Sequence, residues 1–338
     1  MGISTRTHKI LWGWSGGKCA ICRNDLIIDP TSLKDAESVV GDEAHIIARK
    51  ESFTRGDYDS LSPEERDQYP NLILLCKVHH KQIDDQSDFL TVEKLREIKR
   101  LHEDEVKSRW TDKDAKKQAD EILYAGYIDE WQTKADLDNW HNISSWVSDE
   151  MPSIPKEWYE SQKEFLIWII GRIWPKRHPL LEDALTTYGV VLQDFLNVFD
   201  MHVDWDREGD SILRTRKFYQ IREFDEKRYH ELADQYTAHV RLVSDLFFEL
   251  TRAANFVCDR VRETIFPGYR LKEGVVLIER HSVGWGLKTI RARVEYRGEE
   301  RIARPYPGLK EFKTIRYSRD YALDPSGLQK PGSDEDYQ

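Results

Sequence analysis

The chain has 338 residues and a net charge of −10, with 51 Lys and Arg against 61 Asp and Glu. This length is a prior for two domains, and the acidic balance argues against broad nonspecific affinity for nucleic acid. Four cysteines in the whole chain exclude a disulfide scaffold and indicate a reducing compartment. The N-terminus lacks the apolar core of a signal peptide, and the most apolar run, 165–174, is too short to span a bilayer. We therefore expect a cytoplasmic protein without a membrane partner.

A small mixed domain is predicted for roughly the first hundred residues. Residues 1–15 are expected to form a short helix or an extended segment, 23–40 a strand and a loop, and 39–48 a strand or hairpin. The run Ser62-Pro63-Glu64-Glu65 supplies an N-cap, a proline at the first helical position and a capping-box glutamate. One short helix is therefore expected inside the loop of residues 49–70.

Two helices and a charged segment are expected to end this domain. An apolar run at 71–75 precedes a helix predicted for 77–84, and Thr91 opens a further helix with apolar residues at helical spacing. Residues 107–120 are charged and carry little apolar pattern, which is typical of a linker between domains. We therefore place the first domain at 1–110.

The second domain, 121–324, is predicted to be mainly helical. Pro155 and Pro179 each open a helix, and the second of these has apolar residues spaced along one face. A heptad-like apolar spacing from Asp225 to Pro267 predicts a helix of about 40 residues, which would be about 60 Å long. This helix belongs to an intramolecular bundle or pairs with a second copy in a homodimer, and the bundle is the simpler interpretation.

A small sheet is predicted near the C-terminus. The apolar period changes to two over residues 275–296, and a further strand is expected at 312–317. Arg291 and Arg293 alternate with the buried positions and face outward together. They are either solvated and paired with neighbouring glutamates, or they hold DNA or a regulatory nucleotide. The polar tail, 325–338, is expected to be disordered.

Two short spacings in the first domain predict a structural zinc site. Cys19 and Cys22 form a C-x-x-C pair, and Cys76 and His79 repeat this spacing as C-x-x-H. Each pair places two ligands on one turn, and the long insert lets the two turns converge on a tetrahedral Zn²⁺. These four residues are the predicted zinc ligands.

Three further polar residues lie within the same stretch and are not needed for zinc. His45 stands in Ala-His-Ile, Asn71 in Asn-Leu-Ile-Leu-Leu-Cys and His80 in His-His-Lys-Gln-Ile-Asp. In this order, and with the two zinc half-sites, the motifs resemble the HNH nuclease family, whose ββα-metal fold holds a catalytic ion between a hairpin and a helix. We therefore predict an α+β protein in which an N-terminal ββα-metal zinc module precedes a mainly helical domain with a small antiparallel sheet.

The resemblance implies a role for each of these residues. His45 would be the general base that takes a proton from the attacking water, a task that suits an imidazole because its ordinary pKa lies near working pH. His80 would bind a catalytic Mg²⁺ or Mn²⁺ ion, which polarises the scissile phosphate. Asn71 would fix the loop and orient the base by hydrogen bonding.

Two departures from the family pattern bear on the metals. His79 stands where the family usually has cysteine, although three Cys and one His form an ordinary zinc set. Ala44 stands where many members have an aspartate that binds the catalytic ion. Asp42 or Glu43 must then supply the second ligand, and Glu43 is preferred because it lies on the same side of a regular strand as His45.

Simpler structural roles compete with these assignments. His45 could be a buried histidine that satisfies a loop, and Asn71 could be a turn or cap residue. His79 and His80 could exchange roles, although the C-x-x-H spacing favours His79 for zinc. His102 is expected at the surface.

The sequence favours metal-dependent hydrolysis of DNA phosphodiester bonds, regulated by the second domain through a nucleotide or a protein partner. A role in bacterial antiviral defence is expected from association with the family alone. The alternative is a non-catalytic zinc-stabilised module that binds DNA or a protein. The alanine at position 44 favours this alternative.

Overall fold

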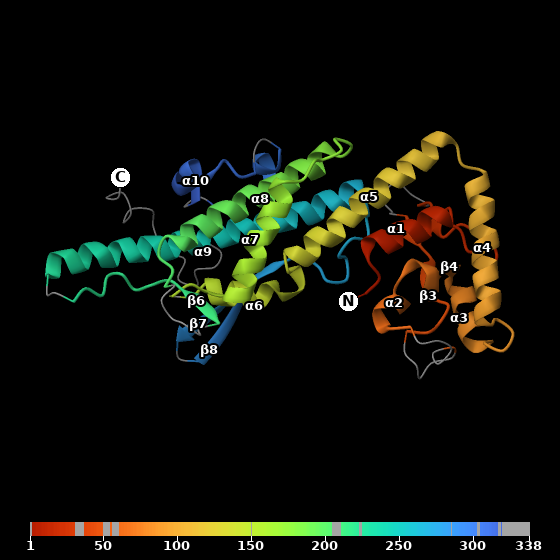
Figure 1. The fold of residues 1–338 in the computed structure, drawn as a ribbon, viewed down its shortest axis with the longest axis horizontal. Helices are drawn as coiled ribbons and strands as arrows, with labels where there is room; N and C mark the ends of the chain where they lie inside the picture. Colours follow the sequence, from red (N-terminus) through yellow and green to blue (C-terminus); the bar gives the residue numbers. More distant parts are fainter. Residues whose placement is uncertain are drawn as a thin grey trace. The chain divides into compact units, whose positions relative to one another are not determined.

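The chain divides into two compact units, Met1–Glu130 and Trp131–Gln338. The computed structural model describes residues 2–30, 37–49, 55, 61–149, 151–204, 211–222, 225–284, 286–302, 305–316 and 319, without the side chains of 281–288 and 290. Helices dominate these residues and the strands form small antiparallel sheets (Figure 1), so the predicted α+β class is confirmed. The compact units divide after Glu130, which is later in the chain than the charged residues 107–120. The domain ranges 1–110 and 121–324 stay predictions.

Unit 1 is built around an antiparallel hairpin and the helix that follows it. Its elements are α1 (Thr5–Trp14), β1 (Ile27–Ile28), β2 (Ser38–Val39), β3 (Gly41–His45), α2 (Pro63–Arg66), the 3-10 turn η1 (Tyr69–Asn71), β4 (Leu72–Cys76), α3 (Lys77–Asp85), α4 (Val92–Ser108) and α5 (Asp112–Lys134). Strand β3 pairs with β4 so that Gly41 lies opposite Cys76 and His45 opposite Leu72. The first four residues of β4 are fully buried, which anchors the hairpin in the core of the unit.

The capping signals read from the sequence are confirmed. Glu65 N donates to Ser62 Oγ at 3.2 Å and Ser62 N donates to Glu65 Oε2 at 2.8 Å, so the capping box of α2 is complete. Thr91 caps α4 by accepting a hydrogen bond from Lys94 N. Each helix therefore begins where its local sequence predicts.

The charged residues 107–120, expected as a linker, lie instead at the end of α4 and in the first half of α5. Hydrogen bonds and an ion pair join α5 to α1 along the length of α5, and they explain why these residues form a helix and not a linker. Gln118 Nε2 donates to Lys9 O at 2.8 Å, and Lys9 Nζ lies 2.9 Å from Glu121 Oε2. The Asp129 carboxylate also accepts from two backbone N–H groups at the start of α1.

The expectation that His102 lies at the surface is wrong. Its side chain is 1% exposed, and Nε2 lies 3.0 Å from the carbonyl oxygen of Ser15. Burial and the charge of Arg23 lower the pKa of His102 from its ordinary value. Residue type did not reveal this, because the apolar Leu101 directly before it is 50% exposed while the polar His102 is buried.

Unit 2 is a helical bundle with two small antiparallel strand pairs, β5 with β6 and β7 with β8. Its elements are η2 (Leu137–Asn139), α6 (Trp140–Val147), β5 (Ser153–Pro155), α7 (Lys156–Ile170), α8 (Pro179–Asp200), β6 (Ile212–Arg214), α9 (Glu226–Thr264), β7 (Leu277–Gly284), β8 (Gly286–Arg293), η3 (Gly298–Arg301) and α10 (Leu309–Ile315). Helices α8 and α9 lie side by side (Figure 1), and the buried residues of α9 run from Tyr236 to Val261. The long helix therefore contributes to the intramolecular core between Tyr236 and Val261, and homodimer formation stays a prediction.

In the C-terminal region one expectation is wrong, and the structure favours one of the two alternatives given for Arg291 and Arg293. Residues 312–317 were predicted as a strand, but Phe312 lies in α10, where its ring packs against Tyr306 at a centroid distance of 5.5 Å. Arg291 Nε lies 2.7 Å from Glu279 Oε2, and Arg293 Nε lies 2.7 Å from a carboxylate oxygen of Glu295. Arg291 and Arg293 therefore lie on a solvated face and are paired with glutamates, which is the first of the two alternatives. The predicted disordered tail lies outside the described residues.

None of the described helices combines the length and the apolar character that crossing a membrane would require.

Candidate metal centre and active site

The predicted zinc ligands come together in unit 1. One ligand atom from each of Cys19, Cys22, Cys76 and His79 lies within 4.8 Å of all the others. His79 Nδ1 is 3.1 Å from the sulfur of Cys76 and 3.5 Å from that of Cys19. A tetrahedral Zn²⁺ with ordinary bond lengths separates its ligand atoms by about 3.3–3.8 Å. The quartet is therefore consistent with a structural zinc site.

Backbone contacts position the two halves of this quartet. Ala20 N, inside the first turn, donates to Leu74 O of β4 at 2.9 Å. Cys76 is both the last residue of β4 and the N-cap of α3, so His79 lies in the first turn of that helix. The hairpin thereby brings the C-x-x-H pair against the C-x-x-C turn.

The electrostatics of Cys19 suit a metal-bound thiolate. Burial raises the pKa of the Cys19 thiol, but backbone N–H groups of Cys22, Cys76 and Ile21 stabilise the anion, and the net pKa is lowered. Zn²⁺ binds cysteine as the thiolate, so this preference assists metal loading.

His80 lies beside a different carboxylate from the one that sequence reasoning preferred. Its Nδ1 is 3.3 Å from Asp42 Oδ2, and its Nε2 is 3.9 Å from Asp84 Oδ2. His80 and Asp42 are about one-third exposed, at 34% and 39%. Adjacent ligands of an octahedral Mg²⁺ lie about 3 Å apart, so this pair fits two positions and leaves the others to water and substrate.

Glu43, the preferred second ligand, has other partners. Its Oε1 accepts a hydrogen bond from Trp12 Nε1 at 3.0 Å and is paired with His8 Nδ1. Both partners belong to α1, so Glu43 links β3 to that helix. Asp42 is therefore the better candidate for the second ligand of a catalytic ion.

His45 is held by an aspartate that sequence reasoning missed. His45 Nε2 lies 2.9 Å from Asp67 Oδ1, and Arg49 Nη2 lies 3.2 Å from the other oxygen of that carboxylate. The Asp67 side chain is 9% exposed, whereas that of His45 is 22% exposed. A buried carboxylate thus orients a partly accessible imidazole, the arrangement that fixes the tautomer of a base.

Asn71 acts on the backbone around this pair. Its Oδ1 accepts from Ile47 N at 2.8 Å, and its Nδ2 donates to Ile47 O and to Arg66 O. Ile47 lies two residues after His45, and Arg66 directly precedes Asp67. Asn71 thus bonds to the backbone on both sides of the pair, while the side chain that bonds to the imidazole is that of Asp67.

Arg55 connects two histidine clusters, one formed by His45 with Asp67 and the other by His80 with Asp42 and Asp84. Its Nε donates to Ile46 O at 2.9 Å, and its Nη2 lies 3.4 Å from Asp84 Oδ1. Ile46 directly follows His45, while Asp84 flanks His80, so one guanidinium reaches both clusters. The Arg55 side chain is 6% exposed, as expected for a structural clamp. No local motif in the sequence marks this arginine.

Comparison with protein families adds an independent observation. Residues 19–87 match a family described as HNH endonuclease. The matched segment begins at Cys19 and contains both the zinc quartet and the two histidine clusters. No curated protein matches the chain. The resemblance inferred from the motifs is therefore confirmed for the N-terminal region.

Replacing Cys19 or Cys76 with serine should release zinc and unfold unit 1, because binding of a structural metal contributes folding free energy. Metal analysis and thermal unfolding of the purified chain measure this. Cys258→Ala is the matched control, since Cys258 is buried on α9 and burial raises the pKa of its thiol to about 12. A Cys19→Ser protein that stays folded without zinc would contradict a structural role for the ion.

Replacing the two adjacent histidines one at a time should give different zinc contents. His79→Ala is expected to lower both zinc content and thermal stability, because it removes one of four ligands. His80→Ala should leave both nearly unchanged, because its ring contacts Asp42 and not the sulfurs. Equal zinc loss in the two variants would show that the assignment of this pair is wrong.

Proposed function

We propose, from the match of residues 19–87 to the HNH endonuclease family, that the chain hydrolyses DNA phosphodiester bonds in a metal-dependent reaction. The observation that carries the proposal is the hydrogen-bonded pair of His45 and Asp67 in the matched segment, at 2.9 Å. A zinc module that only binds DNA or protein has no need of an imidazole held by a buried carboxylate.

The His45 ring has two distinct nitrogens in this arrangement. The Asp67 carboxylate accepts a hydrogen bond from Nε2–H, which leaves the lone pair on Nδ1 to accept a proton from the attacking water. Arg49 pairs with the second carboxylate oxygen and so holds Asp67 in place. His45 is thereby oriented before substrate arrives.

His80 and Asp42 would hold the catalytic Mg²⁺ or Mn²⁺, in place of the family aspartate that Ala44 replaces. Bound there, a divalent ion supplies stabilisation of negative charge on the phosphate and the leaving oxygen. The partial exposure of both side chains leaves room for a phosphate group to reach them. Asp84, next to His80, adds negative charge that favours a cation.

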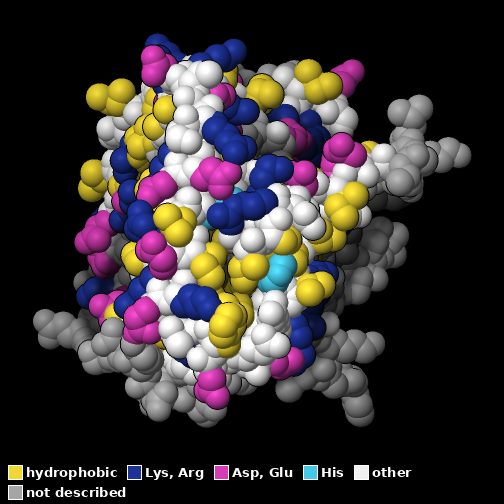
Figure 2. Space-filling model, turned by 90° about the vertical axis from the view of Figure 1, so that its right-hand side faces the viewer, with side chains coloured by type: hydrophobic (Ala, Val, Ile, Leu, Met, Phe, Trp, Pro, Cys, Tyr) yellow, Lys and Arg dark blue, Asp and Glu magenta, His cyan; other side chains and the backbone are white. Residues whose placement is uncertain are grey.

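DNA binding would rest on local cations and not on a broad basic surface. On the face shown in Figure 2, Lys and Arg side chains are interspersed with Asp and Glu. Near the histidine clusters, Arg49 is 51% exposed and Lys81, in α3, is 73% exposed. Both side chains can contact phosphates beside the cut, and such contacts would weaken with rising salt.

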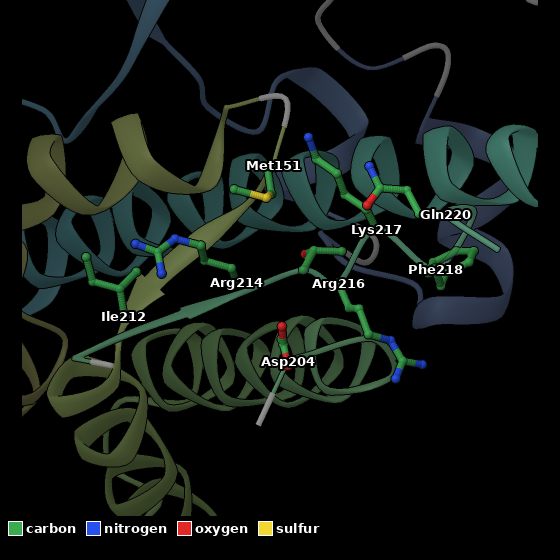
Figure 3. Close-up of a pocket in the computed structure, with 9 residues that line it drawn as sticks. Met151, Asp204, Ile212, Arg214, Arg216, Lys217, Phe218 and Gln220 are labelled. Atoms are coloured by element: carbon green, nitrogen blue, oxygen red, sulfur yellow. The ribbon is translucent and has the colours of Figure 1, made fainter. Parts of the chain in front are cut away.

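Unit 2 would regulate the nuclease or bind a partner protein, because an uncontrolled nuclease endangers its own host. Its large core and its own cavity beside β6 (Figure 3) make it more than a linker.

The antiviral defence role, the cytoplasmic location and a homodimer remain predictions of the sequence. The zinc-stabilised binding module without hydrolysis is the competing function, and Ala44 favours it.

A plasmid nicking assay separates the two functions. The wild-type chain should cleave DNA with Mg²⁺ or Mn²⁺ and lose cleavage with a chelator of these ions. His45→Ala should reduce the rate by about 10²- to 10⁴-fold, the usual contribution of a general base. His230→Ala is the matched control, because His230 is 69% exposed on α9. If the zinc-loaded wild-type chain cleaves no plasmid DNA either with or without Mg²⁺ or Mn²⁺, the non-catalytic binding module is favoured.

Asp67 should behave as a positioning residue for His45. Asp67→Asn is expected to slow cleavage with little change in KM or zinc content, because an amide no longer selects the Nε2–H tautomer. Nitrogen NMR of the His45 ring measures the tautomer directly, without substrate. Asp67→Glu should restore part of the rate. An unchanged tautomer in Asp67→Asn would remove this role, whatever the rate.

A further inference from the structure

The end of α7 and its connection to α8 expose four large aliphatic side chains, which we call the aliphatic tip. The exposed fractions are 75% for Ile167, 63% for Ile170, 89% for Ile173 and 56% for Leu180. Because α7 ends at Ile170 and α8 begins at Pro179, all four lie within one short stretch of unit 2. A single exposed aliphatic residue is ordinary, but a group of four usually marks a surface that another molecule covers.

Unit 2 cannot bury the aliphatic tip by turning α7. The opposite face of this helix is already core, because Phe165 is 0% and Ile169 is 4% exposed. The centroid of the Phe165 ring lies 5.7 Å from that of Tyr188 in α8. Each residue turns a helix by about 100°, so residues 165 and 167 point in nearly opposite directions. A rotation of α7 that buried Ile167 would therefore expose Phe165.

The charge of this region changes sign along the chain. Residues 156–164 contain three Glu against two Lys, a net charge of −1, and Glu160 and Glu164 are exposed. Residues 165–181 contain three Lys or Arg and no Asp or Glu, a net charge of +3, and Lys176 is exposed. The surface is therefore weakly acidic along the first half of α7, aliphatic at its end and basic in the connection to α8.

A surface with this order of charge is complementary to itself. When two identical helices pair antiparallel about a two-fold axis, the acidic half of each lies beside the basic end of the other, and the aliphatic residues meet between them. An anionic bilayer would attract Lys176 but repel Glu160 and Glu164, so it fits this surface less well. Arg172 and Arg177 also make contacts within the chain, which leaves Lys176 as the cation most available to a partner.

We propose that the aliphatic tip and the exposed face of α7 bind the same surface of a second copy of the chain. Ile167 and Ile170 pack against their counterparts near the two-fold axis, and Glu160 of each copy lies near Lys176 of the other. This interface differs from a pairing of α9, whose buried residues already contribute to the core of unit 2. It uses no residue of the zinc quartet or of the histidine clusters, so it does not depend on nuclease activity.

Sedimentation equilibrium of the full zinc-loaded chain tests the proposal. The wild type should reach twice the mass of one chain as its concentration rises. Ile167→Asp with Ile170→Asp should raise the dissociation constant of the dimer at least about 30-fold, because both positions lie at the centre of the interface. Ile302→Asp is the matched control and should associate as the wild type does, because Ile302 is 87% exposed and lies outside this surface.

A charge exchange keeps the test decisive if that double variant does not fold. Lys176→Glu alone should weaken the dimer, because it brings like charges together across the interface, and adding Glu160→Lys should restore association. Both positions are exposed, so neither change alters the core.

Three results would overturn the proposal. They are a wild type that stays monomeric at every concentration, a dimer that the changes at Ile167 and Ile170 leave intact, and a Glu160→Lys change that does not rescue Lys176→Glu. Binding of the monomer to vesicles of phosphatidylcholine and phosphatidylglycerol, abolished by Ile173→Asp, would assign the aliphatic tip to a membrane instead.

Discussion

The convergence of two short turns at one Cys/His quartet sets the geometry of unit 1. Cys76 ends β4 and is the N-cap of α3, so a zinc ion bound by the quartet would fix where the helix starts and how it is rotated. Neighbouring residues on an α-helix point about 100° apart. With His79 turned toward the sulfurs, His80 must point elsewhere, and it meets Asp42 of β3. The zinc site thus places the second histidine without touching it.

A second constraint acts through hydrogen bonds of the buried backbone. Asn71 is 4% exposed and bonds to the loop that follows His45 and to the carbonyl that precedes Asp67. One amide therefore fixes both partners of the imidazole–carboxylate pair relative to each other. Its removal would break three hydrogen bonds to the backbone, and an unsatisfied buried backbone group costs about 1–3 kcal/mol. The catalytic role proposed for the pair depends on these structural hydrogen bonds.

Sequence spacing predicted the features that depend on local order. The zinc quartet, the capping box at Ser62 and the long helix α9 all arise from residues whose partners lie nearby or at a fixed period. Asp67 and Arg55 could not be found in this way, because each meets its partner across an insert with no periodic pattern. The strand predicted for residues 312–317 was wrong because a short alternating pattern does not distinguish a strand from a short helix with one buried residue. Residues 309–315 form α10, in which Phe312 is the buried residue.

Strand alternation raises the question of how Asp42 and His45 can serve one phosphate, since residues three apart in a regular strand point to opposite faces. His45 is the last residue of β3, and beyond it Ile46 N bonds to Asn71 O as the chain enters the loop held by Asn71. The alternation therefore ends at His45, whose direction is set by Asp67. Arg55 then ties Ile46 to Asp84 beside His80. A side-chain network, and not the strand, thus determines how the two histidines are related.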